Sequence, residues 1–96
     1  MTQEQQHREP VEVERVQTGV RLSAPVLKVL KGLAEYKNMG LGDLVEGIVL
    51  HAFDNKTPFS KETLGVITKL KNVYGLDMTS ADAHPFSEPG KGARRS

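Results

Sequence analysis

The stretch from Val16 to Phe53 constrains the fold of this chain more than any other. It reads VQTGVRLSAPVLKVLKGLAEYKNMGLGDLVEGIVLHAF, in which a short alternating segment runs into two amphipathic segments separated by a glycine-containing turn. Alternation predicts a β-strand, here over residues 15–22, and apolar residues three and four apart predict α-helices. The segment holds no partner for this strand, and an unpaired strand exposes a row of backbone donors and acceptors. The pattern therefore predicts pairing with a second copy, and so a homodimer.

Alternation also assigns each residue of the predicted strand to a face, because successive side chains of a strand point in opposite directions. The inward face is formed by Val16, Thr18, Val20 and Leu22. The outward face is formed by Arg15, Gln17, Gly19 and Arg21. Val11 and Val13 have the opposite parity, so the strand begins near Arg15 or contains a bulge.

Two helices are predicted after the strand. Ser23 is a favourable N-cap for the first helix, and residues 38–40 (NMG) are typical of its end. The second helix is expected to start at Gly42 or Asp43 and to close at residues 55–58 (NKTP). The predicted dimer core consists of Val16, Thr18, Val20, Leu22, Leu30, Leu33, Ile48 and Val49.

The remaining segments divide the chain into four parts. Residues 1–14 are a polar, acidic arm, and residues 15–55 are the dimerisation and binding domain. Within residues 56–76, Ser60 caps a third amphipathic helix that Gly75 stops. Residues 77–96 are rich in Ser, Ala, Pro and Gly, a composition that predicts disorder.

Composition excludes several classes of protein. The 96 residues contain no cysteine, so disulfides and thiolate chemistry are absent. No apolar run reaches the roughly 18 residues that cross a bilayer, and the N-terminus lacks the apolar region of a secretory signal. There is no nucleophile with a nearby base, no phosphate-binding glycine loop and no metal-ligand spacing. We therefore expect a cytoplasmic protein that is not an enzyme and needs no cofactor or metal.

The net charge of +1 hides a segregated distribution. Residues 15–38 hold five basic side chains against Glu35, giving +4, whereas residues 39–55 hold only acidic ones, giving −3. Residues 56–76 hold four lysines against Glu62, giving +3. A concentrated positive block favours a nucleic-acid partner, although a solvated helix face has the same composition.

The order strand, helix, turn, helix resembles the ribbon-helix-helix family, to which Arc and the methionine repressor belong. The resemblance covers about residues 15–55 and rests on VRLS at the strand's end, the Leu/Ala stripe, and MGLGDLVE at the turn. It implies a mainly α fold with one short N-terminal strand, here followed by a third C-terminal helix. Two copies would intertwine around an intermolecular, two-stranded antiparallel ribbon that enters the DNA major groove.

The resemblance also implies site residues and a function. The DNA bases would be contacted from the outward positions Gln17, Gly19 and Arg21. The DNA phosphates would be contacted by Arg15, Lys28, Gly42 and Asp43. The expected function is sequence-specific double-stranded DNA binding by a nucleoid-associated transcriptional regulator, in keeping with a repressor. Gly19 lacks a side chain and Asp43 carries a carboxylate, and both depart from the family's pattern.

Other interpretations remain open from the residues alone. The amphipathic helix over residues 60–74 is suited either to packing on its own dimer or to docking a partner protein, as in an antitoxin. A nucleoid-type binder with little sequence preference is compatible with Gly19. Gly32 and Gly47 interrupt their helices, which indicates either close helix approach or tolerance at an exposed position.

Overall fold

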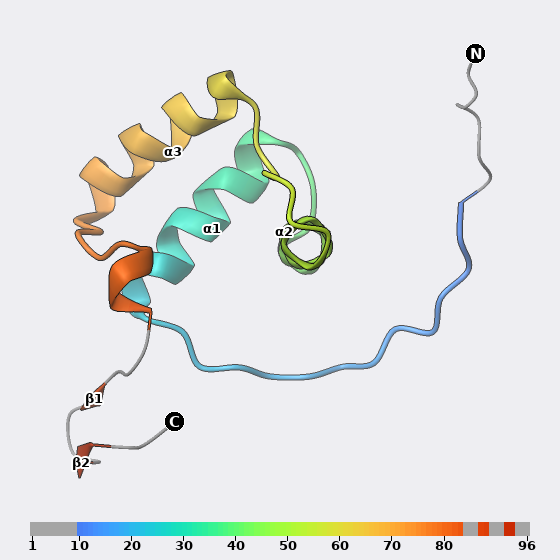
Figure 1. The fold of residues 1–96 in the computed structure, drawn as a ribbon, viewed down its shortest axis with the longest axis horizontal. Helices are drawn as coiled ribbons and strands as arrows, with labels where there is room; N and C mark the ends of the chain where they lie inside the picture. Colours follow the sequence, from blue (N-terminus) through green and yellow to red (C-terminus); the bar gives the residue numbers. More distant parts are fainter. Residues whose placement is uncertain (1–9, 84–86, 89–91, 94–96) are drawn as a thin grey trace.

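Three α-helices form the folded part of the chain. The computed structural model describes residues 10–83, 87–88 and 92–93. α1 spans Ala24–Tyr36, α2 spans Leu41–Phe53 and α3 spans Lys61–Tyr74. α3 lies alongside α1, whereas α2, seen end-on, crosses the direction of both (Figure 1). α1 is the central element, because both α2 and α3 pack against it.

The helix boundaries follow signals that are visible in the sequence. Ser23 is the N-cap residue of α1, but its side chain makes no capping hydrogen bond, and a proline lies in the first turn. After α1, Asn38 takes a left-handed φ of 57°, which Asn tolerates better than most residues. Gly40 is extended and is the N-cap of α2, so that α2 begins at Leu41, one residue before Gly42 and two before Asp43, the predicted starts.

α3 has the ends that the sequence predicts. The Ser60 hydroxyl accepts a hydrogen bond of 3.1 Å from the backbone N–H of Thr63, which satisfies one of the free amides of the first turn. Gly75 ends the helix with a left-handed φ of 68°, a conformation that glycine adopts without steric cost. Both capping predictions are therefore confirmed.

The core lies where α1 meets the other two helices. Leu33 is 2% exposed and clusters with the buried Ala34 and Leu44. Side chains from all three helices and from the α2–α3 connection pack around this cluster, namely Leu30, Ile48, Phe59, Val66, Ile67 and Leu70. The 3–4 spacing of these residues is what brings them to one side of each helix.

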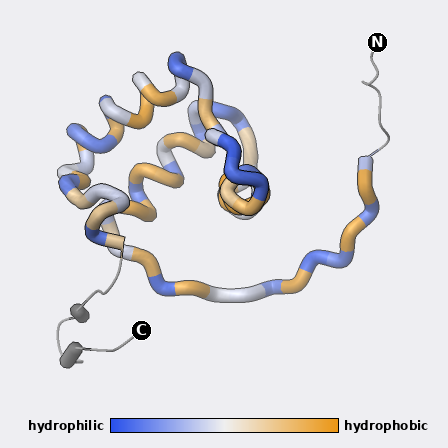
Figure 2. Tube along the Cα trace, in the orientation of Figure 1, coloured by the Kyte–Doolittle hydropathy of each residue, from blue (hydrophilic) through white to orange (hydrophobic). Residues whose placement is uncertain are grey.

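The predicted N-terminal β-strand and the ribbon-helix-helix architecture are wrong. Residues 10–22 contain no strand and run as an extended, solvent-exposed segment into α1 (Figure 1). Alternating hydrophobicity persists along this segment (Figure 2). A strand, however, exists only through hydrogen bonds to a neighbouring strand, and no described segment of the chain supplies one to residues 15–22.

Beyond α3 the sequence predicts no regular structure. The described residues there include a short 3₁₀ helix, η1, over Ser80–Asp82, in which Thr79 and Asp82 form a reciprocal capping box. They also include two short strands, β1 over Ser87–Glu88 and β2 over Gly92–Ala93. These strands pair antiparallel, with Ser87 opposite Ala93 and Glu88 opposite Gly92.

Two of the helical glycines, Gly32 and Gly47, are expected to respond differently when a methyl group is added. A Cβ at Gly47 of α2 would have no atom within 4 Å, whereas a Cβ at Gly32 of α1 would lie 2.9 Å from Leu70 Cδ2. We expect Gly47→Ala to raise the free energy of unfolding by about 0.5–1 kcal/mol, the helix-propensity difference. Gly32→Ala should gain less, or lose stability, because Leu70 must move. Urea unfolding of the two variants tests this, and equal gains would show that α1 and α3 are not closely packed at Gly32.

Candidate functional site

An apolar groove lies between the extended segment and the first two helices. Its volume is about 550 Å³, and four residues of the segment, two of α1 and five of α2 line it. Gly42 and Leu41 stand at one end of its α2 wall, and Val49 lies two helical turns further along. The extended segment, α1 and α2 therefore all contribute apolar surface to one groove.

The groove gathers most of the residues that the sequence assigns to a dimer core. Six of the eight line it, namely Thr18, Val20, Leu22, Leu30, Ile48 and Val49. Leu33 lies instead in the core of the single chain, and Val16 is 76% exposed outside the groove. In the single chain Val20 is also 74% exposed, so the assignment of these residues to a dimer core stays a prediction. Large exposed apolar surface of this kind marks an interaction site.

Basic side chains occupy the solvent face of α1. Lys28 and Lys31 are exposed and stand three residues apart, so they lie on the same side of the helix. Arg21 lies on the exposed segment, between the groove-lining residues Val20 and Leu22. Of the predicted base-contacting residues, Gln17 and Gly19 are likewise exposed on this segment.

Three of the four predicted phosphate-contacting residues meet at the N-terminal part of α2. Arg15 Nη1 donates a hydrogen bond of 2.7 Å to Asp43 Oδ1, and Arg15 Nη2 donates one of 3.0 Å to Glu46 Oε1. A Cβ at Gly42 would lie 3.6 Å from Arg15 Nη2. Lys28, the fourth, lies on the solvent face of α1. The hydrogen bond to Asp43, with the charges of Asp43 and Glu46, raises the pKa of Arg15 above its usual value.

Glu46 is the member of this cluster that the sequence did not single out. It lies three residues after Asp43 on α2, a spacing that puts two carboxylates on one side of a helix. That spacing was a visible signal. The contact with Arg15, which lies 28 residues before Asp43 and 31 residues before Glu46, gave no such signal.

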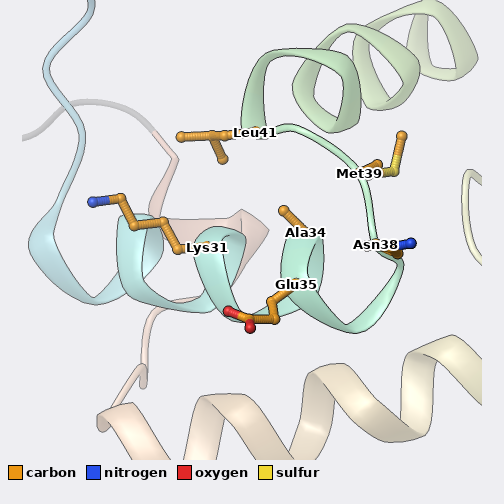
Figure 3. A pocket seen from close by; sticks show the side chains of 6 residues that line it. All are labelled: Lys31, Ala34, Glu35, Asn38, Met39 and Leu41. Carbon is orange, nitrogen blue, oxygen red and sulfur yellow. The ribbon is translucent and has the colours of Figure 1, made fainter.

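A shallow hollow of about 380 Å³ lies between the C-terminal half of α1 and the start of α2. Its polar lining residues are Lys31, Glu35 and Asn38, and the polar ends of their side chains point in different directions (Figure 3). Ala34, Met39 and Leu41 supply the rest of the lining. Because the polar groups do not converge, the hollow lacks the geometry of a small-molecule site.

Part of the apolar surface of α3 packs within its own chain. Val66, Ile67 and Leu70 pack against the core cluster on α1 and α2. The most exposed apolar residue of α3 is Val73, near its C-terminal end. This packing corresponds to the interpretation in which the third helix covers its own fold.

The chain matches no protein-family model, no curated protein sequence and no solved structure. Among the described residues, no helix is both long enough and apolar enough to cross a bilayer. The functional interpretation therefore depends on the groove, the basic face and the cluster around Arg15.

Proposed function

We propose that the chain forms a homodimer that binds double-stranded DNA sequence-specifically and acts as a transcriptional regulator. The observation that carries the proposal is the apolar groove, several of whose lining residues are sequence neighbours of the exposed basic residues Arg21, Lys28 and Lys31. The groove supplies a surface for a second copy, and the flanking charges supply a surface for phosphate. A β-ribbon is not required.

The small size of the core supports pairing through the groove. In the described chain, the buried apolar residues are Val29, Leu33, Ala34 and Leu44. A single core in a unit of fewer than about 70–80 residues rarely supplies more than 3–5 kcal/mol, and oligomerisation is one common supplement. Covering the groove with a second copy would remove further apolar surface from water.

Charge also favours a second copy as the occupant of the groove. α2 carries acidic residues and no lysine or arginine, whereas residues 15–38 carry a net charge of +4. In a two-fold dimer the same surface meets itself, so each acidic α2 can face the basic part of its partner. Such pairing opposes like-charge contacts and fixes the orientation of the two copies.

DNA is the partner that best fits the basic face of the resulting dimer. Arg21, Lys28 and Lys31 of each copy would form one positively charged surface beside the groove. If all of these residues contact phosphate or displace its counterions, the logarithm of the binding constant should fall with a slope of roughly −5 against the logarithm of salt concentration. A two-fold dimer would favour a palindromic or repeated site.

Arg21 is the best candidate for reading bases, since arginine can donate two parallel hydrogen bonds to guanine. We expect Arg21→Ala to weaken binding to a selected genomic site by about tenfold or more, and to weaken binding to a random duplex much less. Anisotropy titrations over a salt series, on genomic fragments and random duplexes, measure both effects. Lys61→Gln, which removes an exposed charge from the start of α3, is the matched control.

The outcomes separate the candidate functions. Equal losses on both duplexes for Arg21→Ala would favour a binder with little sequence preference, as Gly19 allows. An absence of salt-sensitive binding to any duplex would exclude DNA as the partner while leaving the dimer to be tested by sedimentation. The alternative of a protein-docking module on α3 has less support, because Val66, Ile67 and Leu70 of α3 already pack on the core cluster.

A further inference from the structure

The guanidinium of Arg15 bridges two carboxylates on one side of α2. One terminal nitrogen bonds Asp43 at 2.7 Å and the other bonds Glu46 at 3.0 Å. All three side chains are about half exposed, so water and ions reach the cluster. The contact joins the extended segment to a helix that begins 26 residues later in the chain.

This cluster ties the extended segment to α2 through side chains. Within residues 10–22, no backbone hydrogen bond to a helix is present among the described residues. Residues 11–21 are all exposed, and Thr18, Val20 and Leu22 form one wall of the apolar groove. The Arg15 contacts therefore fix where this wall stands relative to α2.

The same contacts occupy the atoms with which Arg15 would bind DNA. Arginine recognises phosphate and carboxylate with the same planar fork of N–H donors. A phosphate that approaches Arg15 in this arrangement also approaches Asp43 and Glu46, whose charges repel it. Arg15 can thus serve the carboxylates or a phosphate, and the two uses exclude each other.

We propose that Arg15, Asp43 and Glu46 form a clasp that holds the extended segment on α2 and competes with DNA for the Arg15 guanidinium. The inference rests on the proposed function, because it names DNA as the competitor. The clasp lowers the affinity for phosphate until it opens, and opening releases the segment and Arg15 together.

The test is a cycle of variants measured on one random-sequence duplex at fixed low salt. We expect D43N/E46Q to bind about tenfold more tightly than the natural sequence, because Arg15 becomes available. In a chain that also carries R15Q, the same two changes should gain only about twofold, from the loss of negative charge alone. Asp54→Asn removes the acidic side chain at the C-cap of α2, outside the cluster, and it measures the general effect of losing one negative charge.

Non-additivity of the cycle is the signature of the clasp. If D43N/E46Q gained equally with and without Arg15, the carboxylates would act only as distant negative charges, and the clasp would be refuted. If no variant bound DNA at low salt, both the competition and the proposed function would be wrong.

A measurement without DNA tests the holding role separately. The chain contains no cysteine, so Gln17→Cys provides a single attachment site for a nitroxide on the exposed segment. We expect the nitroxide spectrum to report faster motion in D43N/E46Q and in R15Q than in the otherwise unchanged chain. Unchanged motion would show that the cluster does not hold the segment, whatever the DNA titrations give.

Discussion

Leu33→Ala is expected to lower the free energy of unfolding by about 3–4 kcal/mol. Leu33 is 2% exposed and belongs to the cluster that joins α1 to α2 and α3. Truncating a buried leucine removes apolar contacts and leaves a cavity, at a cost of about 2–5 kcal/mol. Because a small core supplies only about 3–5 kcal/mol in total, little stability should remain, and a substantial fraction of the variant should be unfolded at 25 °C.

Urea unfolding followed by far-ultraviolet circular dichroism measures this effect. Val73→Ala is the control, since Val73 lies on α3 and is 72% exposed. A change there should stay within about 0.5 kcal/mol. A loss at Leu33 no larger than the loss at Val73 would contradict the position of the core.

The urea midpoint of the unchanged protein should also rise with protein concentration if unfolding is coupled to dimer dissociation.

The helices were predictable from the sequence because their signals are local. The cap at Ser60 and the stop at Gly75 involve contacts within one turn of α3. Asn38 likewise ends α1 through its own backbone conformation. Residues whose role depends on neighbours three or four positions away can be assigned without knowledge of the rest of the fold.

The strand prediction failed because a strand forms only when a second strand pairs with it, and a local alternating pattern does not supply that second strand. Alternation at Val16 and Val20 shows that these side chains share a face, but a strand also requires a partner. The described chain provides none, so these residues extend into solvent. The resemblance to the ribbon-helix-helix family supplied a second copy as the missing partner. That partner stays a prediction, and the structure corrects only the strand in the described chain.

Several residues of the candidate site could be named from the sequence, but the contacts between them could not. The sequence named Thr18, Leu22 and Val49 as sharing one apolar surface, and the groove brings them together. It also predicted that Arg15 and Asp43 contact DNA phosphates, but it did not predict that they contact each other. Their ion pair spans 28 residues, a separation that neither helical nor strand periodicity addresses.

Val49→Asp is expected to abolish the proposed dimer while leaving the helices intact. Val49 lines the groove on α2 and is 39% exposed in the single chain, so an aspartate there remains in contact with water. In the dimer the same carboxylate would be buried against apolar surface, which costs several kcal/mol unless it is paired. It would also add to the acidic charge of Asp43 and Glu46. The dissociation constant should rise at least about 100-fold.

Sedimentation velocity over a range of concentrations measures this shift, and circular dichroism checks that the helices persist. Val73→Asp introduces the same charge on α3, outside the groove, and should leave the dimer unchanged. Because a monomer presents half of the basic surface, Val49→Asp should also reduce the salt slope of DNA binding by about half. If Val49→Asp and Val73→Asp sedimented alike, either as dimers or as monomers, the groove would not be the contact between two copies. DNA binding would then have to arise from the basic face of a single chain.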